Sequence, residues 1–130
     1  MVRLVDAARE ASGDPGLSVS SLSTPCPGCG AVVPEVPGGP THPSLSASPG
    51  CWALYTALLS REFGAFDARV HQLSVDTYAV QHPGPPSLRA ARSVCAHLVA
   101  LCLSLEHGFG VDDLRPIAGN LGKGRYFAPE

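Results

Sequence analysis

The sequence predicts an all-α protein, a small antiparallel helical bundle with an irregular, zinc-pinned N-terminal loop that is zinc-knuckle-like. Three observations support this prediction. Residues 48–108 contain three long segments that begin at helix-capping residues and end at glycine or proline. Residues 25–43 contain six prolines, which exclude helix and central strand. The same stretch carries the motif CPGCG at residues 26–30, a turn that can aim two thiolates at one metal ion.

The 130 residues are expected to form one domain, because domains commonly run to about 100–150 residues. We expect residues 1–24 to be a variable N-terminal segment, with a short helix over residues 2–11. Residues 25–130 are then a single zinc-binding helical domain. An irregular segment as long as the one before residue 48 needs a substitute for a packed core, and a metal cross-link is one.

The first long helix is predicted to open at Ser48, which can cap it ahead of Pro49, and to close at Gly64. The second begins after Asp67 and ends at His82, where the next residues are rich in proline. Both helices have a capping side chain at the start and a helix breaker after the end, so their bounds are predicted from local chemistry alone.

The third helix is predicted over residues 87–108. Its section over residues 94–105 is apolar on all sides, so we expect it to be the central, buried helix of the bundle. A weaker fourth helix is predicted over residues 111–121, broken by Pro116 and Gly119.

Composition limits the partners. The formal charge is -2 and the nine basic residues are scattered, so neither nucleic acid nor an anionic membrane is an expected partner. No signal peptide is visible, and the apolar run of residues 94–105 is shorter than the roughly 20 residues that span a bilayer. We therefore expect a cytoplasmic protein, and the scarcity of lysine suggests a GC-rich bacterial source.

Five cysteines in a reducing compartment indicate ligands or nucleophiles rather than disulfides. Cys26 and Cys29 of the CPGCG motif form half of a predicted zinc site, and Cys51, at the head of the first helix, is the natural third ligand. A redox pair is the rival interpretation of the motif, but the expected flanking strand and helix are absent. Cys95 and Cys102 are expected to pack in the core.

The fourth ligand separates a structural from a catalytic metal. His82 is the predicted fourth ligand, with His42 or His71 as the alternative. His42 would close a purely local site. His71, Tyr78 and His82 lie on one stripe of the second helix, which we expect to face the knuckle, a pocket or a substrate. A seam of hydrogen-bonded histidines between helix and loop would explain the same stripe.

Asp76 and His97 are predicted to pair, because each is a polar group inside a helix that has to find a partner. Beside a zinc site such a pair could act as general acid and base, or it could orient a metal ligand. Tyr78 and Gln81 are candidates for orienting a substrate. The predicted catalytic set is therefore Asp76, Tyr78, Gln81 and His97.

Three motifs, CPGCG, SPGCW and VDTYAVQHPG, carry a resemblance over residues 25–107. The chain resembles an uncharacterised family of small, helical bacterial proteins that is known only as a domain of unknown function. The resemblance assigns no activity and no roles. It implies that the shared motifs include Cys26, Cys29, His42, Cys51, His71, Asp76, Tyr78, Gln81, His82 and His97. The chain departs from the family at Ser44, where an aromatic residue is expected.

Two functions follow from these residues. The first is a zinc-dependent enzyme, a hydrolase, lyase or cyclase acting on a small organic molecule in specialised metabolism, with a zinc-bound water at the fourth position. The alternative is a structural zinc module that binds another protein or serves regulation without catalysis. A thiol redox protein is a third. A small-molecule substrate and a homodimer are the partners that the sequence leaves open.

Overall fold

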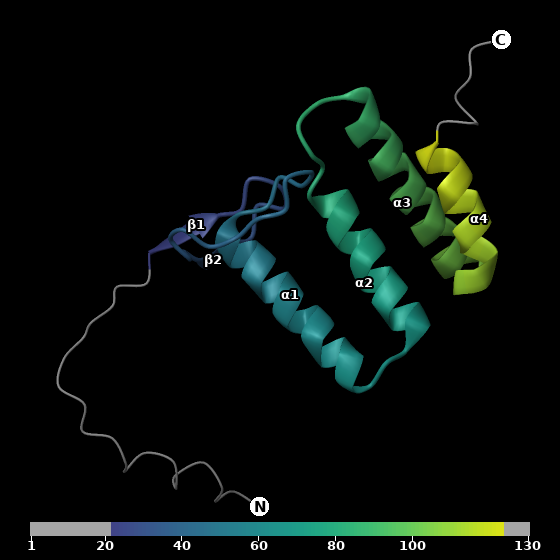
Figure 1. The fold of residues 1–130 in the computed structure, drawn as a ribbon, viewed down its shortest axis with the longest axis horizontal. Coiled ribbons are helices and arrows are strands. Elements are labelled where there is room, and N and C mark those ends of the chain that lie inside the picture. The colour runs from purple at the N-terminus through teal and green to yellow at the C-terminus, as the bar shows by residue number, and fades with distance from the viewer. Residues whose placement is uncertain (1–21, 124–130) are drawn as a thin grey trace, which may run out of the picture.

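Four helices account for most of residues 22–123, the part of the chain that the computed structural model describes. They are α1 (Pro49–Gly64), α2 (Ala68–Gln81), α3 (Leu88–His107) and α4 (Val111–Gly122). Figure 1 shows them in sequence order in a row, each antiparallel to the next, and α4 contacts α2 as well as α3. The loop that precedes α1 lies at the end of the row where α1 begins and α2 ends. The predicted all-α fold class is thus confirmed in outline.

A short two-stranded ribbon is the element that the sequence did not predict. Strand β1 (Ser23–Pro25) pairs antiparallel with β2 (Val32–Pro34), with Thr24 opposite Val33. The ribbon is the stem of the CPGCG turn. The expected boundary between residues 24 and 25 falls inside β1, and the helix expected over residues 2–11 lies outside the described residues.

The first three helices begin and end where the capping residues predict. The Ser48 hydroxyl accepts a hydrogen bond from the Cys51 N–H at 3.2 Å, the Asp67 carboxylate accepts from the first turn of α2, and Ser87 caps α3. Gly108 ends α3 with a φ of 70°, in the left-handed region that favours glycine. These caps fix the helix ends that position the candidate site.

The prediction of a broken fourth helix is wrong. Helix α4 runs without interruption through Pro116 and Gly119. Proline inside a helix removes a hydrogen bond and costs about 3 kcal/mol. Burial offsets this cost, because Leu114 and Leu121 of α4 are both buried and α4 packs along α3.

Helix α3 packs between α2 and α4, as predicted for a central helix, but the prediction that it is buried is wrong. Leu98 and Leu105 are 49% and 62% exposed, and Cys102 is exposed rather than packed in a core. Helices α2 and α4 cover only part of α3, which buries one narrow stripe of small residues, Ala96, Ala100 and Ser104. Among the described helices, only α3 is long and apolar enough to cross a membrane. One such helix is weak evidence for a membrane span.

The most deeply buried side chains are polar or sulfur-bearing. His82, Asp76 and Cys26 are the largest fully buried residues in the described part of the chain. The apolar cluster at the loop end of the row consists of Cys26, Val33, Ala47, Cys51 and Tyr78. Potential metal ligands therefore lie inside the cluster that holds the loop to the helices.

Candidate metal centre

The CPGCG motif forms the tight turn at the tip of the ribbon. The Gly30 N–H donates to the Cys26 carbonyl and the Cys26 N–H donates to the Ala31 carbonyl, both at 2.8 Å. Gly30 has a φ of 74°, which a residue with a side chain adopts only with strain. The turn brings Cys26 and Cys29 to the same side of the ribbon, as the motif predicts.

Gly28 lets this turn lie directly on the end of α2. A Cβ atom at Gly28 would be 2.5 Å from the Ser46 carbonyl oxygen and 2.7 Å from the His82 ring. Neither is a distance that real Cβ atoms adopt. Glycine at this position is therefore a requirement for contact between the turn and His82.

Cys51 and His82 reach the turn from two antiparallel helices. Cys51 lies in the first turn of α1, and His82 is the residue that ends α2. Because α1 and α2 are antiparallel, the start of one and the end of the other lie at the same end of the row (Figure 1). Residues 31 positions apart thus become neighbours, with the Cys51 sulfur 3.2 Å from His82 Nε2.

Four donor atoms gather at this point. The sulfurs of Cys26, Cys29 and Cys51 and a ring nitrogen of His82 all lie within 4.8 Å of one another. Cys29 and Cys51 are 3.9 Å apart, sulfur to sulfur. Cys26 is 2% exposed and His82 is 1% exposed. The described chain thus contains a buried Cys3His cluster that could hold a metal ion.

The His82 ring is oriented by a backbone carbonyl. Its Nδ1 lies 2.8 Å from the Tyr78 carbonyl oxygen, one helical turn earlier. A carbonyl oxygen can only accept, so Nδ1 carries the proton and Nε2 presents its lone pair to the sulfurs. Metal-binding histidines are commonly oriented in this way, by a hydrogen bond at the other ring nitrogen.

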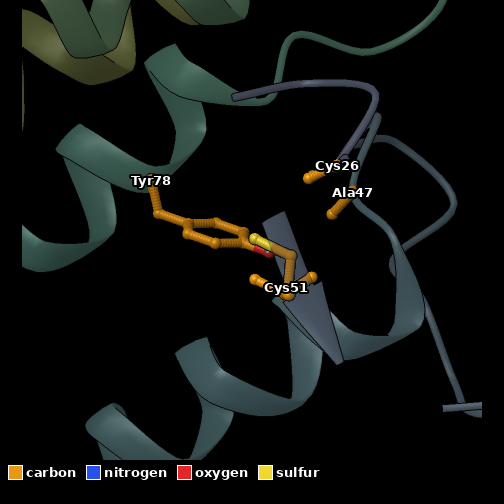
Figure 2. Packing of buried hydrophobic residues seen from close by; sticks show 5 residues of the cluster. Cys26, Ala47, Cys51 and Tyr78 are labelled. Atoms are coloured by element: carbon orange, nitrogen blue, oxygen red, sulfur yellow. Dashed lines mark hydrogen bonds between the residues drawn. The ribbon is translucent and has the colours of Figure 1, made fainter. Parts of the chain in front are cut away.

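Tyr78 supports the cluster from the side of α2. Its hydroxyl donates to the Cys51 sulfur at 3.7 Å, and Figure 2 shows its ring extending from α2 to that sulfur. The ring also stacks on His82 and on Tyr55, with centroids 3.9 and 3.7 Å apart. Burial, and then the hydrogen bond to Cys51, raise the pKa of Tyr78 far above its usual value, so it stays a hydrogen-bond donor.

The sulfurs have unequal proton affinities. Burial opposes ionisation of Cys26, but backbone N–H groups aimed at its sulfur, that of Cys29 foremost, lower its pKa to about 6. One of them, the Ser48 N–H, lies 3.4 Å from the sulfur. Burial raises the pKa of Cys51 to about 11, against the opposing hydrogen bond from Tyr78. The pocket therefore stabilises one thiolate before any cation is added.

The two alternative fourth ligands lie elsewhere. His42 is exposed, accepts from the Ser44 N–H at 3.2 Å and lies against the Trp52 ring. His71 pairs with Glu62 of α1 at 3.0 Å, near the opposite end of α2. Neither belongs to the Cys3His cluster, so of the three candidate histidines only His82 is brought to the sulfurs.

The predicted Asp76–His97 pair forms, but it does not adjoin the cluster. Asp76 Oδ1 lies 2.7 Å from His97 Nδ1 and accepts a second hydrogen bond from Gln72. Asp76 precedes Tyr78 by two residues, which on a helix is a rotation of about 200°. Asp76 therefore faces α3 while Tyr78 faces the sulfurs, and Gln81 is exposed.

Sequence reasoning missed three residues: Tyr55 and Ser48 support the site, and Glu62 joins α1 to α2 near the opposite end of α2. Tyr55 stacks on Tyr78, and Glu62 accepts hydrogen bonds from His71 and Ser74. The Ser48 N–H contacts the Cys26 sulfur. Tyr55 follows Cys51 by one helical turn, and this spacing could have suggested that Tyr55 lies near the cluster. The other two depend on how α1, α2 and the loop pack together.

A row of four helices with a buried Cys3His cluster at one end defines a small helical protein with a candidate metal site. The chain belongs to a family of unknown function, DUF5946, whose model matches residues 24–125. Searches of curated proteins and of solved structures returned no match. The family assignment agrees with the resemblance seen in the sequence and assigns no activity.

Proposed function

We propose that the protein binds one zinc ion at the Cys3His cluster and that this zinc is structural. The observation that carries the proposal is the convergence of four donor atoms within 4.8 Å at a buried point. Tetrahedral donors about 2.3 Å from a zinc ion lie about 3.8 Å from one another. The Cys29–Cys51 and Cys51–His82 distances, 3.9 and 3.2 Å, are close to this value.

The donor types favour zinc. Three thiolates and one imidazole in a tetrahedral arrangement are a common structural zinc set. Magnesium and calcium require oxygen donors, and the cluster contains none.

The number of donors favours a structural ion over a catalytic one. A catalytic zinc has three protein ligands and leaves one position to water, whereas four protein donors complete the tetrahedron. The side chains expected to do chemistry are also committed or remote. Tyr78 donates to a ligand sulfur, and Asp76 of α2 and His97 of α3 pair with each other outside the cluster. The geometry thus favours the structural alternative over the metal-dependent enzyme.

A structural role explains why the segment before α1 needs the metal. The apolar side chains that hold the ribbon and loop to the helices are few, and two of the five in the buried cluster are cysteines. A metal ion that joins the ribbon to α1 and α2 would supply the missing cross-link. The zinc would then shape this end of the molecule as part of a non-catalytic binding or regulatory module.

The cytoplasm is the proposed location. The cysteines of the described residues are free, including Cys29 and Cys51, whose sulfurs are 3.9 Å apart. Thiols this close stay reduced in a reducing compartment and in the presence of a metal ion.

Metal analysis and X-ray absorption spectroscopy test the proposal. We expect one zinc per chain in protein purified without added metal, and a zinc shell of three sulfurs and one nitrogen. A shell containing an oxygen donor would instead support the catalytic alternative. Protein that neither retains zinc nor takes it up would contradict both.

A further inference from the structure

A second polar group lies on the face of α2 opposite the metal centre. Asp76 is 2% exposed, and its Oδ1 holds His97 Nδ1 at 2.7 Å. Asp76 can only accept here, so His97 carries its proton on Nδ1 and its Nε2 is left available. No other residue of the described chain hydrogen-bonds to this Nε2. The pair is therefore a fixed imidazole with one nitrogen available to a ligand.

His97 lines a hollow of about 320 Å³ between α2, α3 and α4. A second hollow, of about 400 Å³, lies between the start of α3, the end of α2 and the loop around residue 44. Arg89 and Ser93 line both hollows. The two hollows are therefore adjoining parts of one groove, which we call the α3 groove.

Arg89, Ser93 and His97 are spaced by four residues along α3, which places them in one stripe along the groove. Among the residues that the structure describes, Arg89 has no acidic partner and the Ser93 hydroxyl has no hydrogen bond. Arg89 and Ser93 thus present an unpaired guanidinium and a free hydroxyl to both hollows, and His97 presents a ring nitrogen to the smaller one. Guanidinium groups bind carboxylates and phosphates through two parallel hydrogen bonds.

The walls of the larger hollow are mostly apolar. They are formed by Pro83, Pro85, Pro86, Leu45 and Val94. Ligand sites commonly combine such walls with a few converging polar groups. We propose that the α3 groove binds a small organic carboxylate, with the anionic head on Arg89 and Ser93 and the apolar body against the prolines.

A titration followed by two-dimensional NMR of the zinc-loaded protein tests this proposal, with benzoate as the probe. We expect saturable shifts of amides in the first turns of α3 and in the loop around residue 44. Benzyl alcohol, which has the same ring without the charge, and inorganic phosphate, which has charge without the ring, should each bind at least tenfold more weakly. Equal binding of either compound would overturn the proposal.

Arg89→Gln should weaken benzoate binding by about 10- to 100-fold, because a charge-assisted bidentate contact is lost. Arg115→Gln is the matched control, since Arg115 is an exposed arginine paired with Asp112 on α4. Arg89 is exposed, so its replacement should leave the fold and the zinc content unchanged. Unchanged benzoate affinity in Arg89→Gln, or an equal loss in Arg115→Gln, would refute the assignment while leaving the zinc proposal intact.

Discussion

Replacing Cys26 with serine tests the metal centre most directly. Cys26 is 2% exposed, and its sulfur is the one stabilised as a thiolate by backbone N–H groups. Serine keeps the shape of the side chain, but its hydroxyl is a poor zinc ligand at neutral pH. The substitution therefore removes one donor with little change in packing.

The expected magnitude follows from the number of donors. Structural zinc sites in small domains bind with about 10–16 kcal/mol of apparent free energy. Shared over four donors, this is about 2.5–4 kcal/mol for each, and about 1.4 kcal/mol corresponds to a factor of ten in affinity. We therefore expect Cys26→Ser to weaken zinc binding by about 100- to 1,000-fold.

Competition with a chromophoric zinc chelator measures this change. Cys102→Ser is the matched control, because Cys102 is an exposed, free cysteine on α3 and lies outside the cluster. Limited proteolysis of Cys26→Ser should show faster cleavage in the segment before α1. A zinc affinity within threefold of the unsubstituted protein would refute the assignment of Cys26 as a ligand.

Four further predictions concern other parts of the molecule. Gly28→Ala should weaken zinc binding at least tenfold, because its Cβ would clash with Ser46 and His82. The control is Gly119→Ala, since a Cβ at Gly119 meets nothing. It should leave zinc binding unchanged and raise the unfolding free energy in urea by up to about 1 kcal/mol. Zinc has to displace the proton of Cys51, whose pKa is about 11, so zinc affinity should rise at least tenfold per pH unit between about pH 7 and 9, and a flat profile would count against this ligand. Leu114→Ala should cost about 2–5 kcal/mol of unfolding free energy by circular dichroism with unchanged zinc stoichiometry, since Leu114 is buried and its helix, α4, contacts only α2 and α3 among the described elements. Chelation of zinc should weaken benzoate binding to the α3 groove, and equal affinity with and without zinc would show that the loop wall does not depend on the metal.

The sequence predicted the features that depend on local chemistry. Ser48, Asp67 and Ser87 cap helices as expected, because capping requires only a side-chain oxygen and the next turn of backbone. The CPGCG turn was predictable for the same reason. Cys26, Cys29, Cys51 and His82 were predicted as ligands, and the structure brings these four residues together.

The features that depend on packing were not predictable in the same way. An apolar run such as residues 94–105 normally indicates a buried helix, but burial depends on how much of the helix its neighbours cover, and α2 and α4 leave Leu98 and Leu105 of α3 exposed. His42 and His71 had the right chemistry for a fourth ligand, and only the antiparallel arrangement of α1 and α2 selects His82. The position of Asp76 on α2, two residues before Tyr78, predicts that it points away from the sulfurs. It does not predict that Asp76 faces α3.

The two proposals are connected through the loop before α1. Residues 43–45 form part of the wall of the α3 groove, and three residues further along the chain the Ser48 N–H donates to the Cys26 sulfur at 3.4 Å. Gly84, which follows α2, approaches the Ser44 carbonyl so closely that a Cβ would lie 2.5 Å from it. A zinc ion at the Cys3His cluster would thus fix one wall of the groove from outside it. On this reasoning the metal shapes a binding surface, and the polar residues of α3, rather than the metal, supply its chemistry.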